Sequence, residues 1–124
     1  MNTIFVLLWM IFFHIVDDYN LQGWLASAKQ KSYWEENAPD KLYKHDYICA
    51  LIMHSLSWAF MIMLPMAYYQ QFDIDSAFVI AFLVNTAVHA LVDNAKANWK
   101  IINLWQDQLM HIAQIFLTLP LLYY

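Results

Sequence analysis

Three pairs of His and Asp residues interrupt the most apolar parts of this 124-residue chain. The two members of each pair are four positions apart, and the pairs are His14 and Asp18, His89 and Asp93, and Asp107 and His111. Residues at positions i and i+4 lie on one face of a helix, so each pair directs a nitrogen and an oxygen ligand the same way. Burying so many ionisable groups is costly unless they pair or bind a cation. The pattern predicts helices that meet at a membrane-embedded polar site.

The composition is that of an integral membrane protein. Hydrophobic residues make up 62% of the chain and aromatic residues 18%, and the mean hydropathy is +0.41, whereas about half of the residues are apolar in an ordinary soluble domain. One Gly and three Pro leave little material for turn-rich β-structure. We therefore expect residues 1–124 to form a single all-α membrane domain.

Charge and cysteine content exclude some classes of partner and site. The net charge is −4 and the chain has no basic stripe, which argues against nucleic acid as a partner. Cys49 is the sole cysteine, so neither an internal disulfide nor a Cys-rich zinc motif can form. A metal site in this chain would need His and carboxylate ligands.

Four apolar segments are candidates for membrane spans, namely residues 4–16, 47–69, 77–92 and 109–124. A span needs about 20 mostly apolar residues, so the second segment is long enough alone and the others need their polar flanks. The six Trp residues, Trp58 among them, and several Tyr residues lie mostly near segment ends, as an aromatic belt at the membrane interface requires. These features predict a four-helix transmembrane bundle.

The lysines predict the topology. All six basic residues are lysines, and they lie in two loops, four of them between positions 29 and 44 and two at positions 96 and 100. The positive-inside rule makes both loops cytoplasmic, which places the termini and the loop at 70–75 outside. His54 lies seven residues after Tyr47, or about 10 Å along a helix. His54 and the three pairs should therefore converge in the cytoplasmic half of the bundle.

Residues 23–46 mix charges with aromatic side chains, which predicts an amphipathic connector at the cytoplasmic surface. Asn37, Ala38 and Pro39 should break it into two short helices. Its role as a solvated connector or as a lid over a substrate is left open. His45 and the carboxylates of Asp17 and Asp46 are expected to be exposed at the interface.

Four imidazoles and three carboxylates exceed the ligands of one zinc ion, so they suit two ions, or one ion with a general base. Mixed nitrogen and oxygen ligands fit Zn best, with Mn or Fe as alternatives, better than Ca or Mg. The expected ligands are His14, Asp18, His89, Asp93, Asp107 and His111, with His54 as a ligand or the general base. Hydrogen bonds from Gln22, Asn85 and Gln108, which lie beside the expected ligands, would orient the imidazoles. Lys96, three residues after Asp93, is an alternative partner that could neutralise Asp93 in place of a metal.

Each of these groups also has a non-catalytic interpretation. His54 alone is compatible with a hydrogen-bonded structural residue, and the pair of His14 and Asp18 with a local ion pair. The whole set is also compatible with a proton or metal-ion conductor, or with a bundle whose polar core fixes helix register. Conduction would require polar residues that continue outward, where the stretches 60–66 and 115–122 are apolar except for Thr118.

The polar segments also form a combined signature, made up of residues 14–22, 24–29, 89–96 and 107–111 together with His54. In this order they resemble the family of small bacterial and phage membrane proteins known as domain of unknown function 3307. The resemblance spans nearly the whole chain and is more specific than any single His-x3-Asp motif. Asp17 beside Asp18, and Tyr19 where Phe is expected, depart from the family pattern without touching the expected ligands.

The resemblance implies a small protein of the bacterial inner membrane with a metal-dependent hydrolase site. We expect water activated by the ion to attack a phosphoester or acyl bond of a lipid or lipid-linked substrate at the inner leaflet. Lys29 and Lys96 are candidates to attract an anionic head group. The lipid bilayer is then the main partner, and a homo-oligomer is left open.

Overall fold

The computed structural model describes residues 2–123, and these residues form helices and no β-strand. Helical segments make up 83% of these residues. The α-helices are α1 (Thr3–Val16), α2 (Leu25–Ala28), α3 (Lys31–Asn37), α4 (Asp46–Tyr69), α5 (Ser76–Asn94) and α6 (Leu104–Thr118). Four short segments complete the fold: the π-helical turns η1 (Asp17–Leu21) and η3 (Ala95–Trp99), and the 3₁₀ turns η2 (Lys41–Tyr43) and η4 (Leu119–Tyr123). The all-helical prediction is confirmed.

Three continuous helical stretches are long and apolar enough to cross a membrane. They are Thr3–Leu21 with 19 residues, Lys41–Tyr69 with 29, and Ser76–Trp99 with 24. The fourth apolar segment forms α6, which has 15 residues and starts at Leu104, earlier than the predicted 109. A capping box explains the early start, because the side chains of Asn103 and Gln106 each accept a hydrogen bond from the other's backbone N–H.

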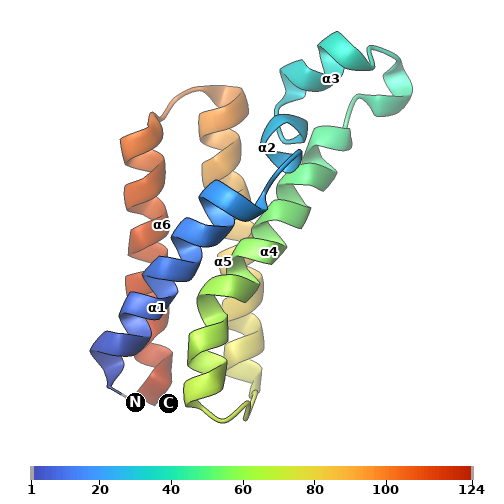
Figure 1. Ribbon diagram of the computed structural model, residues 1–124. Helices are drawn as coiled ribbons and strands as arrows, with labels where there is room; N and C mark the ends of the chain where they lie inside the picture. Colours follow the sequence, from blue (N-terminus) through green and yellow to red (C-terminus); the bar gives the residue numbers. More distant parts are fainter. Residues whose placement is uncertain (1, 124) are drawn as a thin grey trace.

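The helices α1, α4, α5 and α6 lie side by side (Figure 1). α4 packs against α1 and α5, and α6 packs against the same two helices. Both chain ends and the α4–α5 loop lie at one end of the assembly, whereas the connector and the η3–α6 loop lie at the other (Figure 1). This is the grouping of termini and loops that the lysine distribution predicts.

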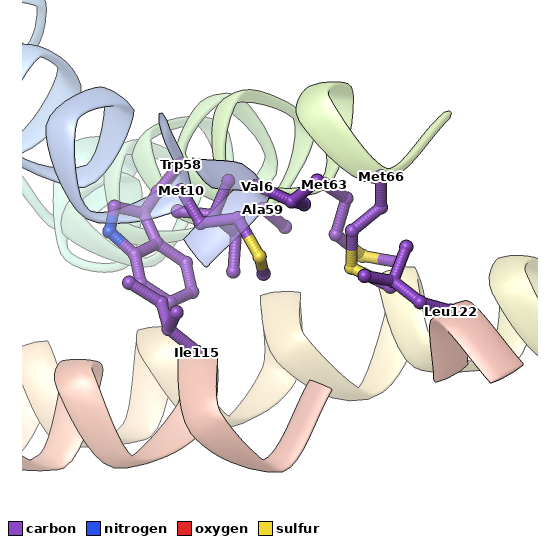
Figure 2. Packing of buried hydrophobic residues seen from close by; sticks show 9 residues of the cluster. Val6, Met10, Trp58, Ala59, Met63, Met66, Ile115 and Leu122 are labelled. Carbon is purple, nitrogen blue, oxygen red and sulfur yellow. The ribbon is translucent and has the colours of Figure 1, made fainter. Parts of the chain in front are cut away.

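The apolar core lies between α1, α4 and α6, toward the end that carries the chain termini. Its members include Val6, Met10, Ile62, Met66 and Ile115, which are fully buried (Figure 2). The assignment of Trp58 to an interfacial belt is wrong, because this side chain is 0% exposed and closes the core on the side of the His/Asp cluster. Its position near the middle of α4, far from either helix end, explains the difference.

The connector folds back over one end of the helices. α3 ends at Asn37, directly before Ala38 and Pro39, so the chain breaks where predicted. The connector nevertheless forms three short segments and not two, namely α2, α3 and the 3₁₀ turn η2. The preceding α2 packs against α4, which brings Lys29 into the interior with 6% of its surface exposed. A lysine expected at a surface is thus part of the buried polar site.

Candidate metal centre

Two π-helical turns border the polar cluster. The first follows α1 and contains Asp17 and Asp18, and the second follows α5 immediately after Asp93 and Asn94. A π-helical turn inserts an extra residue into a helix and is frequently found at functional sites. Within η1 the two consecutive aspartates are both buried. The local geometry thus adds a carboxylate to the site.

The expectation of an exposed Asp17 is therefore wrong. This carboxylate is 1% exposed and accepts a hydrogen bond of 2.5 Å from the Ser57 hydroxyl, and its Oδ2 atom lies 3.9 Å from Nδ1 of His54. The i, i+3 spacing of His54 and Ser57 on one helix face was the available sequence signal. His45, by contrast, is exposed as predicted.

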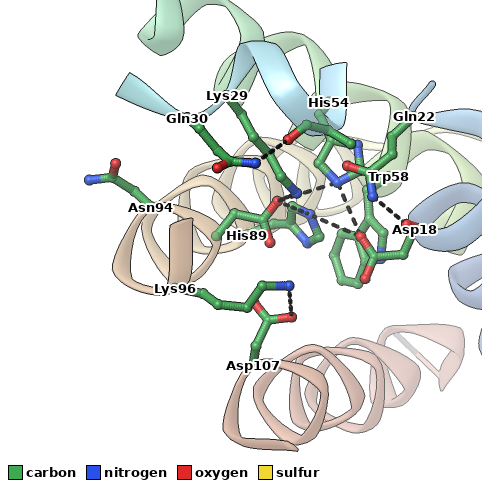
Figure 3. Close-up of polar contacts among 12 residues, drawn as sticks. Asp18, Gln22, Lys29, Gln30, His54, Trp58, His89, Asn94, Lys96 and Asp107 are labelled. Carbon is green, nitrogen blue, oxygen red and sulfur yellow. Dashed lines mark hydrogen bonds and ion pairs between the residues drawn. The ribbon is translucent and has the colours of Figure 1, made fainter. Parts of the chain in front are cut away.

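One group of potential ligands comprises Asp18, His54, His89 and Asp93, each offering one atom within 4.8 Å of the others. Nε2 of His54 lies 3.1 Å from Oδ1 of Asp18 and 3.4 Å from Oδ2 of Asp93. Nε2 of His89 lies 3.6 Å from that same Asp93 oxygen and 4.0 Å from Oδ1 of Asp18. Figure 3 shows Asp18, His54 and His89 pointing toward one another from three different helical segments. Two imidazoles and two carboxylates are a donor set suited to zinc.

A second group consists of Asp18, Asp107 and His111. Nε2 of His111 lies 3.4 Å from Oδ1 of Asp107 and 3.3 Å from Oδ1 of Asp93. Asp93 therefore faces the first group with Oδ2 and His111 with Oδ1, and Asp18 belongs to both groups. Carboxylates shared in this way allow two adjacent cation positions.

The ring of His89 is held by stacking, and its two nitrogens make no hydrogen bond to the described residues. It lies between the rings of Trp58 and His111, with centroid distances of 4.3 and 4.0 Å. The side chain is 0% exposed, and neither ring nitrogen has a hydrogen-bond partner among residues 2–123. Oδ1 of Asp107 lacks one as well. A buried polar atom left unpaired costs about 1–3 kcal/mol, a cost that a bound cation would remove.

Hydrogen bonds on the far side of His111 define its tautomer. Nδ1 of His111 lies 3.2 Å from the amide oxygen of Gln114, so this nitrogen is the donor. Gln114 in turn donates to the side chain of Asn85, which donates to Thr118. Asn85 therefore acts on the site through Gln114. The lone pair on Nε2 of His111 then faces two carboxylates, which is repulsive unless a cation or proton lies between them.

His14 is placed differently from the other predicted ligands. The indole N–H of Trp58 donates to Nδ1 of His14 over 2.8 Å, so Nε2 carries the proton and donates to Gln108 over 2.9 Å. Gln108 in turn donates to Asp18 and Asp107. His14 thus has no free lone pair for a metal in this arrangement. The structure places it as the support of Gln108, which links it to Asp18 and Asp107.

Two lysines neutralise carboxylates of the site. Nζ of Lys29 lies 2.8 Å from Oδ2 of Asp93, and Nζ of Lys96 lies 3.5 Å from Oδ2 of Asp107. The suggested pairing of Lys96 with Asp93 is therefore not formed, because α2 supplies the partner of Asp93 and η3 turns Lys96 toward α6. Gln22 donates to the backbone oxygen of Asp18 and to no imidazole, so it supports the η1 turn.

The Trp58 contacts lead to a stability prediction. Trp58→Phe should lower the free energy of unfolding by about 1–3 kcal/mol, because Nδ1 of the buried His14 loses its donor. Thermal unfolding in detergent would measure the change. The matched variant is Trp105→Phe, whose side chain is 79% exposed and should leave stability unchanged. Equal stability of the wild type and Trp58→Phe would contradict the hydrogen-bonded role of the indole.

Comparisons with models of known protein families, with curated proteins and with solved structures give no match. The chemistry of this site is therefore inferred from its own residues. The structure brings together Asp18, His54, His89, Asp93, Asp107 and His111, and their roles as ligands remain predictions. The buried His/Asp groups are able to hold a metal ion.

Proposed function

We propose that the cluster binds one or two divalent metal ions and that the protein is a metal-dependent membrane hydrolase. The observation that carries this proposal is His89, a fully buried imidazole whose unpartnered nitrogen faces the carboxylates of Asp18 and Asp93. Such a group is costly in a metal-free protein, and a cation between the imidazole and the carboxylates would satisfy all three.

The charge balance supports the same proposal. Four buried carboxylates surround the site, and they belong to Asp17, Asp18, Asp93 and Asp107. Only two ammonium groups, those of Lys29 and Lys96, pair with them among the described residues. The site thus has two more negative charges than positive ones when the histidines are neutral. One divalent cation would restore neutrality, which buried charges require.

In this proposal Asp18, His54, His89 and Asp93 hold the first ion, and Asp18, Asp107 and His111 a second. Zn suits the mixed ligands best, and Mn or Fe would also fit. A bound ion would supply Lewis-acid chemistry that makes water a better nucleophile. His54 has a further capacity, because its Nδ1 faces the carboxylate of Asp17. The 3.9 Å separation is longer than a hydrogen bond, so His54 is a candidate for either a ligand or a general base.

The proposed reaction is hydrolysis of a phosphoester or acyl bond. The water oxygen forms the new bond to phosphorus or carbon, the bond to the leaving oxygen breaks, and the water proton passes to the leaving alcohol. In the alternative arrangement, in which Asp18, His89 and Asp93 alone hold the first ion, His54 is the candidate to carry that proton. No oxidant or reductant is needed.

A four-helix transmembrane bundle is the proposed setting. Apolar side chains are exposed along the outer faces of the helices, including Leu8 on α1, Ile80 on α5 and Leu117 on α6. Large exposed apolar surfaces indicate contact with a membrane or a partner. The lysine-bearing end, with its amphipathic connector, would face the cytoplasm of a bacterial inner membrane.

An apolar groove between α1 and α6 supports a lipid or lipid-linked substrate. The groove has a volume of about 510 Å³ and is lined by Ile11, His14, Ile15, Tyr19, Leu104, Trp105, Gln108 and Ile112. Gln108 links this lining to the site, because its amide donates to both Asp18 and Asp107. An acyl chain in the groove would therefore lie next to the cluster.

Metal-dependent hydrolysis in proteoliposomes tests the proposal. Wild-type protein loaded with Zn, Mn or Fe should release product from phospholipids or lipid-linked phosphates, and chelator-treated protein should not. Ile15→Trp, which fills the α1/α6 groove, should slow turnover about tenfold or more with unchanged metal content. Ile52→Trp in the apolar groove between α4 and α5 is the matched control. A metal-loaded protein without any hydrolysis in this panel would contradict the enzymatic role.

A hydrogen-bonded chain favours a second candidate function. From His111 it passes through Gln114 and Asn85 to Thr118, seven residues farther along α6. This extends the polar network beyond the predicted site, as a proton or metal-ion conductor would require. Ion flux across proteoliposomes should be absent for a hydrolase and present for a conductor. A bundle with a purely structural polar core would show neither flux nor metal.

A further inference from the structure

We propose that the site binds a phosphate group and that Lys29 and Lys96 hold it. This inference rests on the proposed metal centre and selects a phosphate ester over an acyl ester. The observation behind it is that each lysine pairs with a carboxylate that is also a candidate metal ligand, Asp93 for Lys29 and Asp107 for Lys96. A cation bound by these carboxylates would release both ammonium groups for an anion.

The two oxygens of each carboxylate make this exchange possible. In both Asp93 and Asp107 the Oδ2 atom faces a lysine, whereas the Oδ1 atom faces Nε2 of His111 at 3.3 and 3.4 Å. An ion beside His111 would therefore bind the Oδ1 atoms without displacing either lysine. An ion in the first group would share Oδ2 of Asp93 with Lys29, which weakens that ion pair. The ammonium groups would remain at the edge of the centre, where their attraction to the carboxylates is weakened by the ion.

The charge of the occupied centre matches a phosphate monoester. Two divalent ions and two ammonium groups oppose four carboxylates, so two positive charges have no partner. A phosphate monoester dianion supplies the missing negative charges and offers several strong acceptor oxygens. A neutral acyl ester would leave both positive charges uncompensated in a buried site, which is costly. Phosphate binding should therefore need the second metal equivalent.

The two lysines differ in how firmly they are held. The backbone oxygen of Lys29 accepts a hydrogen bond from Asn98, and the neighbouring oxygen of Ala28 accepts one from the Trp34 indole. Lys29 is thus fixed on α2 and directed into the site, unlike an ordinary surface lysine. The Lys96 side chain, which pairs with Asp107 (Figure 3), is 32% exposed, so its end of the cluster is the more accessible one.

Titration with inorganic phosphate, followed by ³¹P NMR, tests the proposal on detergent-purified protein loaded with Zn. The wild type should bind phosphate only when metal is present. Lys29→Met and Lys96→Met should keep their metal and each bind phosphate about tenfold or more weakly, the loss of one charge-assisted hydrogen bond. Lys44→Met, which removes an exposed connector lysine, is the matched control. Lys96→Met keeps the test valid if Lys29→Met fails to fold.

Nanodiscs distinguish a lipid head group from free phosphate. Discs with phosphatidic acid, a phosphate monoester, should compete with inorganic phosphate if the source is a lipid, whereas discs of phosphatidylcholine should not. Competition by neither disc type would assign the site to a soluble phosphate ester. If metal-loaded wild type does not bind phosphate, or if the lysine variants bind it as tightly as the wild type, the phosphate proposal is overturned and the metal centre is not. Protein that binds no metal would overturn the metal centre as well.

Discussion

Replacing Asp93 with Asn should empty the metal centre and also destabilise the protein. Asp93 faces both candidate cation positions, through Oδ2 toward His54 and through Oδ1 toward His111. Asn keeps the shape of the side chain but loses the charge, so bound metal should fall from one or two equivalents to near zero. The buried ammonium of Lys29 would lose its counter-charge, which costs about 3–5 kcal/mol. Elemental mass spectrometry and thermal unfolding in detergent measure the two effects.

A double variant separates metal loss from destabilisation. Asp93→Asn with Lys29→Met removes both members of the buried pair, so it should recover much of the lost stability and still bind no metal. Asp73→Asn, at an exposed carboxylate in the α4–α5 loop, should change neither quantity. Full metal occupancy in the single Asp93→Asn variant would contradict the proposed metal centre.

Much of this site could be predicted because its determinants are local. A His and an Asp four residues apart lie on one helix face wherever the helix goes, and the apolar segments fix where the helices run. The depth of each pair follows from its distance to a segment end. These rules place His89 and Asp93 beside Asp107 and His111, and the structure brings these four together.

The remaining features depend on backbone geometry or distant contacts. The burial of Asp17 depends on the π-helical turn η1, and the hydrophobic periodicity of the sequence does not predict that turn. The ion pair of Lys29 and Asp93 joins residues 64 positions apart, and only the packing of α2 on α4 brings them together. The stacking of Trp58 on His89 also depends on packing, because it joins α4 to α5. Local pattern therefore identified most of the candidate ligands, whereas tertiary context decided their surroundings and, at His14, removed one candidate.

His89→Leu should abolish metal binding without weakening the metal-free protein. Leu removes two buried nitrogens that have no hydrogen-bond partner among the described residues, each of which costs about 1–3 kcal/mol. It also removes the stacking on Trp58 and His111, worth about 0.5–1.5 kcal/mol per pair. The metal-free variant should therefore be as stable as the wild type, or more stable. Thermal unfolding in detergent, with and without added metal, measures both states.

The metal-dependent gain in stability shows whether His89 is a metal ligand or a structural imidazole. Metal at about 100 times its dissociation constant stabilises a protein by about 2.7 kcal/mol, which raises Tm on the order of 10 °C for a chain of this size. The wild type and the exposed control His45→Leu should show this rise, and His89→Leu should show none. A structural imidazole paired with Asp93, 3.6 Å away, would behave in the opposite way. Its loss would destabilise the metal-free protein and leave the rise intact.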